Sequence, residues 1–301
     1  MHSYYVIDMK ITRRTIQIAL GLLWLLDGAL QLQRQMFTHN FATQVIAPNM
    51  VNQPVVIRGP IHFAVHTILL HPGLWDGLFA LIQLSLGILI LLKRTTIYGL
   101  FGSVVWGLSV WYIGEGLGGL FSGHASLLMG APGAALLYAI IALGVLPPRS
   151  PKNKDSAGKP ASWLTIVWAV IWLGGASLQL MQGQNTTAGL SSMIRGMSSG
   201  APGWLAAFDS SVARHLSSAG EPAIIGLVII QALIGIMILL PRHWRTLAVF
   251  SGAIVSLCFW AAGQAFGTFY SGLATDPNTA PLIILLGLAI LGTRRIVISV
   301  F

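Results

Sequence analysis

The sequence predicts an all-α polytopic membrane protein in which about eight transmembrane helices form two parallel four-helix repeats, with both termini in the cytoplasm. Composition, an internal duplication and the positions of the cations predict this class. Of the 301 residues, 55% are hydrophobic and 8% are charged, and the mean hydropathy is +0.76. Soluble domains carry roughly 25% charged residues, so this composition indicates a chain that lies largely in a bilayer.

The second half of the chain repeats the first. The segment WLLDGALQLQ, which begins at Trp24, returns as WLGGASLQLM at Trp172, and GEGLGGLFSGHAS at Gly114 returns as GQAFGTFYSGLAT at Gly263. Matches of Trp, Gln and Pro at a nearly constant offset indicate a duplication. The register pairs Gln83 with Gln231, Gly87 with Gly235, Arg94 with Arg242, Trp111 with Trp260 and Pro132 with Pro281.

The duplication divides the chain into a first repeat over residues 1–147, a connector over 148–160 and a second repeat over 161–301. The connector lies in the stretch PPRSPKNKDSAGKP, which is charged and proline-rich and is typical of a cytoplasmic linker. Apolar runs of spanning length predict the helices. They cover residues 15–33, 74–92, 97–118 and 131–147 in the first repeat, and 163–181, 222–240, 246–266 and 280–292 in the second.

Segments 34–73 and 182–221 occupy equivalent places between the first two spans of each repeat. The run IRGPIHFAVHTILLHPG predicts a short interfacial helix after Pro60, and residues 191–218 can form a similar one. Shorter loops follow the third and seventh spans. In the second of these loops, Asp276 and Thr279 are expected to cap the last helix.

The cations predict the topology. If the spans alternate, every cationic cluster falls on one side of the membrane, which is the cytoplasmic side by the positive-inside rule. An even number of spans in each half makes the repeats parallel. A net charge of +9 spread over these turns does not resemble a nucleic-acid stripe. The clusters are Lys10, Arg13 and Arg14; Lys93 and Arg94; Arg149, Lys152, Lys154 and Lys159; Arg242 and Arg245; and Arg294 and Arg295.

Polar residues inside the predicted spans supply the candidate site. Trp24, Asp27 and Gln31 share one helical face, and Gln83 and Glu115 fall at a similar depth on the next two spans. Because a charged group facing lipid costs several kcal/mol, these side chains are expected to face the bundle interior and to form one cluster that opens outward. The alternative is structural: such residues also hydrogen-bond neighbouring helices.

The two repeats differ at the acids. Asp27 becomes Gly175 and Glu115 becomes Gln264, whereas the glutamines persist. This difference predicts a single proton-accepting or cation-binding site, in the N-terminal half, with Asp27 and Glu115 as its candidate catalytic groups. Asp27 is also expected to pair with Gln31.

Two histidines suggest a metal site of lower rank. His62 and His66 lie four residues apart, a spacing that places two imidazoles on one side of a helix. A metal would need further ligands, and histidines beside lipid headgroups are the competing interpretation. The sequence contains no Walker motif, nucleophile elbow or H-E-x-x-H motif. No histidine lies in a predicted span, which argues against a transmembrane haem with two axial imidazoles.

QLSLGILILLKRTT from Gln83 and QALIGIMILLPRHW from Gln231 resemble the second helix of DoxX-like four-helix membrane proteins, and WLLDGALQL resembles their first helix. The resemblance implies a subunit of a periplasm-facing redox or respiratory system in a bacterial or archaeal plasma (inner) membrane. A quinone is the candidate cofactor. An apolar slot that ends in polar groups would hold it, lined by Trp24, Gln31, Gln83 and Trp111.

Two other classes stay open: a small-solute or proton-coupled transporter, and a ligand-free scaffold or assembly factor. Whether the protein is an enzyme is undecided at this point. The expected partners are the lipid bilayer and other subunits of a membrane redox complex, with no nucleic acid. Because a duplicated bundle carries its own partner, an obligate homodimer is not expected.

Overall fold

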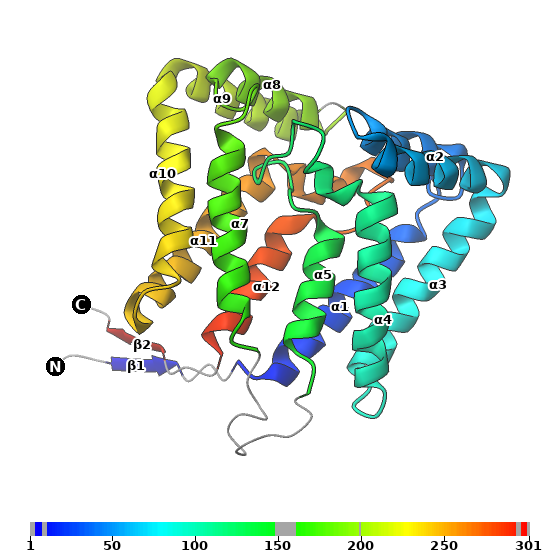
Figure 1. The fold of residues 1–301 in the computed structure, drawn as a ribbon, viewed down its shortest axis with the longest axis horizontal. Coiled ribbons are helices and arrows are strands. Elements are labelled where there is room, and N and C mark those ends of the chain that lie inside the picture. The colour runs from blue at the N-terminus through cyan, green and yellow to red at the C-terminus, as the bar shows by residue number, and fades with distance from the viewer. Residues whose placement is uncertain (1–3, 8–10, 148–160, 199, 293–295, 300–301) are drawn as a thin grey trace.

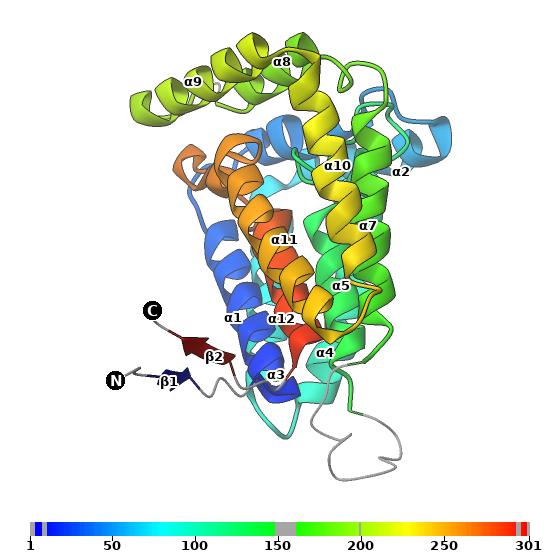
Figure 2. The same ribbon diagram turned by 90° about the vertical axis from the view of Figure 1, so that its left-hand side faces the viewer.

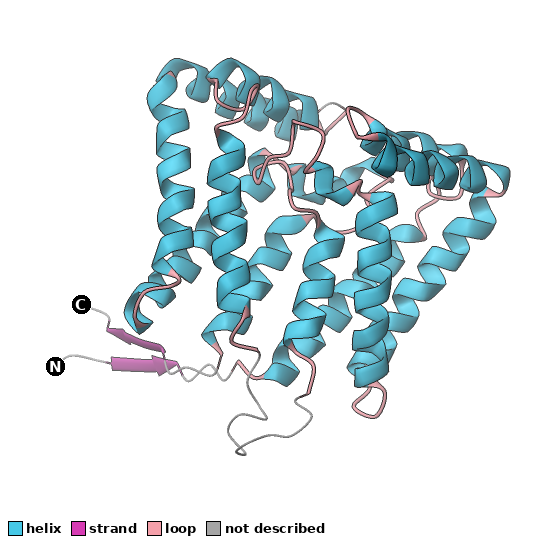
Figure 3. Cartoon of the chain, viewed as in Figure 1, coloured by secondary structure: helices cyan, strands magenta, loops and turns pink. Residues whose placement is uncertain are grey.

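The structure is a computed structural model that describes residues 4–7, 11–147, 161–198, 200–292 and 296–299. Long helices run side by side in both halves of the chain, which confirms the helical class (Figures 1 and 3). The first half supplies α1 (Arg13–Gln31), α3 (Pro72–Leu91), α4 (Thr96–Ser109) and α5 (Ala134–Gly144). The second supplies α7 (Leu164–Gln179), α10 (Glu221–Met237), α11 (Arg242–Ala262) and α12 (Thr279–Leu291).

The packing repeats with the sequence. Helix α1 packs on α3 as α7 packs on α10, and α4 packs on α5 as α11 packs on α12. A Cβ at Gly87 would lie 2.7 Å from Leu25 Cγ, and one at Gly235 would lie 2.8 Å from Leu173 Cγ. Both glycines therefore allow the same close helix approach. The halves join through α5 and α12, and α12 also contacts α1 and α7.

Short helices lie across one end of the bundle, which we call the loop end (Figures 1 and 2). They are α2 (Val55–Leu70), α8 (Thr187–Met197) and α9 (Gly203–Ala219), together with η1 (Phe41–Ile46) and η2 (Ala47–Met50). Helix α2 contains Pro60 rather than beginning after it. The helix expected within residues 191–218 is instead two helices, and α9 meets α10 at a bend of 104° beside Gly220, whose φ is 67°.

The opposite end carries the turns between α3 and α4 and between α10 and α11, where Lys93, Arg94 and Arg242 stand. We call it the cation end. Arg14 Nη1 donates to Ile90 O at 2.9 Å, so it ties the start of α1 to the end of α3. Strands β1 (Tyr4–Ile7) and β2 (Ile296–Ser299) pair antiparallel near this end (Figure 1).

The short β1–β2 ribbon is an addition to the helical architecture that the sequence analysis did not predict. The ribbon joins residues near the two ends of the chain, a long-range pairing that no local sequence period reveals. It also places both described ends of the chain on one side of the bundle.

Three helical segments in the described residues are long and apolar enough to cross a bilayer, and the bent α9–α10 pair gives a fourth if it counts as one span. The three are Pro72–Leu91, Thr96–Gly114, in which π-helix η3 (Val110–Gly114) extends α4, and Arg242–Ser271, in which η5 (Ala265–Ser271) follows α11. Helices α5, α7 and α12 are apolar and shorter. The chain thus has helices fit for a membrane, and the eight-span topology remains a prediction.

One register assignment changes. Trp111 Nε1 donates to Pro132 O at 2.7 Å, and Trp260 Nε1 donates to Pro277 O at 2.8 Å. Structurally, Pro132 therefore corresponds to Pro277 and not to Pro281. The proline follows the tryptophan by 21 residues in the first repeat and by 17 in the second. The two loops therefore differ in length, and the sequence offset between the repeats is not constant across them.

Candidate functional site

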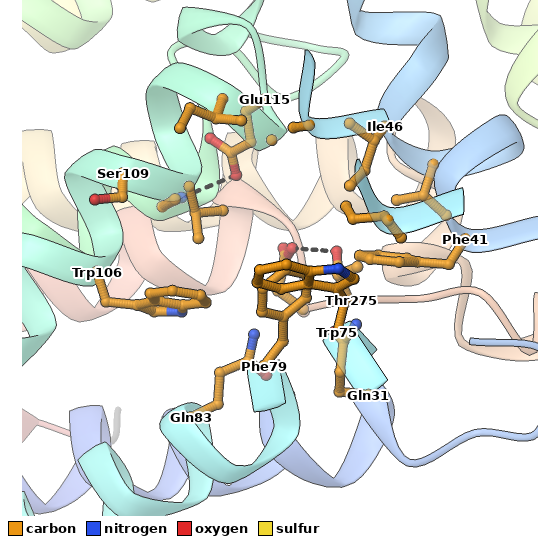
Figure 4. A pocket seen from close by; sticks show the side chains of 18 of the residues that line it. Gln31, Phe41, Ile46, Trp75, Phe79, Gln83, Trp106, Ser109, Glu115 and Thr275 are labelled. Atoms are coloured by element: carbon orange, nitrogen blue, oxygen red, sulfur yellow. Dashed lines mark hydrogen bonds between the residues drawn. The ribbon is translucent and has the colours of Figure 1, made fainter. Parts of the chain in front are cut away.

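A cavity of about 440 Å³ lies in the first repeat near the loop end. Its walls are mainly apolar and aromatic, and they come from α2, α3, α4 and η1 (Figure 4). This volume falls within the range of small-molecule sites, roughly 300–1,000 Å³. The aromatic side chains of the wall are Trp24, Phe41, Phe63, Trp75, Phe79, Trp106 and Tyr138.

Five of the six residues expected at the site on sequence grounds line this cavity, namely Trp24, Asp27, Gln31, Gln83 and Glu115. Figure 4 shows Gln31 and Gln83 across the cavity from Glu115. The structure thus gathers side chains from α1, α3 and the end of η3, which the shared helical face and depth predicted.

Trp111 is the exception. It does not line the cavity, and its indole N–H is used by Pro132 O. The π-helical turn of η3 shifts the residues that follow Ser109 away from ordinary α-helical spacing. Trp106, one turn earlier, lines the cavity in its place.

Asp27 lies on the buried face of α1 and is 2% exposed. One carboxyl oxygen, Oδ1, has no hydrogen-bond partner within the described chain. The Tyr138 side chain interacts with this carboxyl, and Trp24, one turn earlier, donates from Nε1 to Ser103 Oγ at 2.8 Å. Helix packing therefore holds Asp27 against the cavity while leaving an oxygen available to a ligand.

The expected pairing of Asp27 with Gln31 is wrong. Gln31 Nε2 donates to Oδ1 of Asp76, which is fully buried on α3. The reason is the close packing of α1 on α3, where a Cβ at Gly28 would lie 2.6 Å from Leu84 Cγ. Gln83, two turns further along α3, keeps Oε1 without a partner in the described chain.

Glu115 follows η3, where the chain leaves the helix. Its Oε1 accepts a hydrogen bond of 3.0 Å from Ala135 N in the first turn of α5, a position where a negative group is favoured by the helix dipole. Its Oε2 is buried without a partner among the described residues. Glu115 is therefore oriented by one oxygen and free to interact through the other.

Asp276 is the residue that sequence reasoning missed at this site. It comes from the second repeat, yet it lines the cavity of the first. Its carboxylate accepts from Thr275 Oγ1 and from Asn278 N, each at 2.7 Å, whereas the cap of α12 is Asn278. Burial raises the pKa of Asp276 above its ordinary value, and the two hydrogen bonds lower it.

No sequence signal assigned Asp276 to this site, because it reaches the cavity only through the contact between the two repeats. The Asp27 carboxylate interacts electrostatically with those of Asp276 and Glu115.

In the described residues, no group of three His, Cys, Asp or Glu side chains could hold a metal ion. His62 and His66 are exposed on α2 and lie outside the cavity lining.

The corresponding place in the second repeat is filled. A Cβ at Gly175 would lie 2.6 Å from Leu127 Cδ2. Gln264 Nε2 donates to Leu128 O at 3.4 Å, and Gln264 Oε1 accepts from Ala280 N at 3.2 Å. Leu127 and Leu128 belong to the loop before α5 in the first repeat. This loop therefore occupies the space beside Gly175 and Gln264, which stand in the second repeat in place of Asp27 and Glu115.

A second hollow, of about 280 Å³, lies beside the cavity at the loop end. Asn49, Glu115 and Asp276 line both spaces. The remaining polar lining of the hollow consists of Ser122, His124, Ser126 and Asn278. We call this hollow the vestibule.

Comparisons with protein-family models, with curated proteins and with solved structures found no match to this chain. The resemblance to DoxX-like proteins is thus a hypothesis carried by the quoted segments. The chemistry of the cavity is the remaining guide to function.

Proposed function

We propose that the first repeat binds a lipophilic molecule with a small hydrogen-bonding head group, namely a membrane quinol or quinone, as an integral subunit of a redox system that faces the periplasm. The observation that supports this is the pairing of an aromatic-walled cavity with buried oxygens that lack partners. These oxygens are Asp27 Oδ1, Gln83 Oε1 and Glu115 Oε2.

The polar atoms favour the reduced form of such a ligand. A buried oxygen without a hydrogen bond costs about 1–3 kcal/mol, which a donor on a ligand would recover. A quinol carries two O–H donors, and a carboxylate accepts from them. When a carboxyl is protonated, it can instead donate to a quinone carbonyl, so Asp27 and Glu115 suit both redox forms.

The walls fit the ring and the tail. Trp75, Phe79 and Trp106 present aromatic faces to the cavity (Figure 4), and offset stacking of aromatic rings adds about 0.5–1.5 kcal/mol beyond burial. Phe63 on α2 lines the cavity while 73% exposed, so the cavity reaches the molecular surface beside α2. A tail can extend there.

The charge of the lining selects the head group. No Lys, Arg or His is among the described residues that line the cavity, whereas three carboxyls are. An anionic ligand would therefore be repelled, and a neutral quinol would not. The cavity is unsuited to fatty acids or organic phosphates.

A titration of the purified protein in detergent tests the proposal. Trp24, Trp75 and Trp106 line the cavity, so a short-chain benzoquinol or its quinone should quench tryptophan fluorescence saturably. Gln83→Leu should weaken binding about tenfold, because loss of one hydrogen bond in a buried site costs about 1.4 kcal/mol. The matched control is Gln231→Leu at the equivalent position of the second repeat, which should bind as the wild type does. Absence of saturable binding, or equal loss in both variants, would contradict the proposal.

One observation favours a second candidate, a proton-coupled transporter of lipophilic cations. Aromatic faces together with carboxylates also suit a cation. The same titration with tetraphenylphosphonium separates the two: tight binding of the cation with none of the quinol would replace the first proposal by the second.

A further inference from the structure

The cavity and the vestibule meet at two acids. Glu115 and Asp276 line both spaces, and the third shared residue is Asn49. Asn49 Nδ2 donates to Gly114 O at 2.8 Å, which holds η2 against the residue that precedes Glu115. The two carboxyls therefore stand where the apolar cavity gives way to a polar space.

We propose that Glu115 and Asp276 form a proton exit that connects the cavity with the aqueous phase at the loop end. This proton route rests on the proposed function only in one respect: the bound quinol is the source of the protons. A proton leaves the bound ligand, is accepted by a carboxylate and passes through the vestibule to water. The step moves protons alone and requires no further reactant.

The inner end of the route is Asp27. Its unpartnered Oδ1 faces a space that Glu115 and Asp276 also line, and the three carboxylates interact electrostatically. The other titratable group against Asp27 is Tyr138 of α5. Because the three carboxylates repel one another, a state in which at least one of them is protonated is favoured. A proton relay requires such a state.

The outer end of the route is His124. It lines the vestibule and its side chain is exposed. Ser122 Oγ donates to Gly119 O at 2.7 Å and accepts from His124 N at 3.1 Å, so it orders the rim. The exposed imidazole therefore marks the place where the vestibule meets bulk water.

The place related to the exit by the internal duplication lacks both acids. Gln264 stands at the place of Glu115. By the correspondence of Pro132 with Pro277, Ala131 stands at the place of Asp276. Neither side chain carries an ionisable group, so the chain has one such route and the duplication does not provide a second copy of it.

Carbodiimide labelling tests the route without any ligand. These reagents couple to protonated carboxyls. In sealed vesicles with the loop end outside, a charged water-soluble carbodiimide should label Glu115 and Asp276 and should spare Asp27. Membrane-soluble dicyclohexylcarbodiimide should label Asp27 as well. Peptide mass spectrometry locates the adducts. Labelling of neither exit acid by the water-soluble reagent, or labelling only in inverted vesicles, would overturn the proposal.

A block of the vestibule provides the decisive variant. Ser122→Cys, in a Cys258→Ser background, can be modified with a bulky maleimide after folding. Modification should abolish water-soluble labelling of Glu115 and Asp276 while dicyclohexylcarbodiimide still labels Asp27. The matched control is Ser271→Cys at the equivalent position of the second repeat, which lines neither space. Unchanged labelling after the block would refute the exit.

The two proposals fail in different ways. If labelling and its block behave as expected while the quinol titration shows no binding, the exit stands and the protons come from another ligand. If the titration succeeds and the labelling is absent, the cavity binds its ligand and releases protons elsewhere.

Discussion

Asp27 and Asp276 come from different repeats, and both carboxyls line one cavity. The site is therefore built by both halves of the chain, which corrects the expectation that it belongs to the N-terminal half alone. Each repeat contributes a residue to the other, because Leu127 of the first repeat fills the space beside Gly175 of the second. Gln33 Nε2 donates to Ala274 O at 3.1 Å, and Gln184 Nε2 donates to Ala125 O, so each repeat also anchors the loop of the other.

Asp276→Asn is expected to change how stability depends on pH. Burial raises the pKa of Asp276 above the unfolded value of about 3.9, so the folded protein holds this proton more tightly than the unfolded chain. Stability is then lost as the pH rises from about 4 through the folded pKa. The melting temperature of the wild type relative to the variant should fall over that window.

Thermal unfolding in detergent at a series of pH values measures this difference. Glu221→Gln, which removes an exposed charge at the start of α10, is the control for the loss of one negative charge. A wild-type-minus-variant difference that is independent of pH would contradict the role of burial.

Asp76→Leu should destabilise the protein by about 1–3 kcal/mol, because Gln31 would keep a buried amide without its acceptor. Asp76→Asn retains an acceptor oxygen and should cost less. Unfolding in denaturing detergent measures both free energies. Equal losses for the two variants would show that the hydrogen bond to Gln31 is not the origin of the effect.

Trp111→Phe should leave quinol affinity unchanged and lower stability by about 0.5–1.5 kcal/mol, the net contribution of one hydrogen bond. Its indole is committed to Pro132 O and not to the cavity. Trp260→Phe, which removes the same hydrogen bond in the second repeat, should match it. Trp75→Leu should weaken binding instead. Titration calorimetry separates these outcomes, and a lower affinity for Trp111→Phe alone would place that residue at the ligand.

Leu127→Ala should destabilise the protein by about 2–5 kcal/mol, the usual cost of a buried Leu-to-Ala change that leaves a cavity. Leu127 is 3% exposed and packs where Gly175 leaves room. Leu257→Ala, at a helix position that is 50% exposed, serves as the surface control. Similar losses of unfolding free energy in the two variants would mean that Leu127 does not fill a tightly packed space beside Gly175.

The helices and the main face of the site follow from local sequence. Long apolar runs favour helices, which satisfy their backbone polar groups within the segment, and the structure places helices over all eight runs. The spacing of Trp24, Asp27 and Gln31 fixes one face of α1 whatever packs against it. Those three residues line the cavity as the spacing indicates.

The loops obey no such period. The β1–β2 ribbon, the division of residues 191–218 into α8 and α9, and the shift of Pro277 against Pro132 all depend on contacts between distant segments. The partner of Gln31 likewise depended on how closely α1 approaches α3, which a single helix face does not specify.

The sequence by itself determined that this chain is helical and duplicated, and that the acids Asp27 and Glu115 are special to one copy, because composition, period and internal comparison are local properties of the chain. Only the tertiary structure decided that Asp276 completes the cavity of the first repeat and that Leu127 closes the space in the second. The physical reason is that the loop before α5 packs on the second repeat and the loop before α12 packs on the first, so the volume available at each place is set by both halves together.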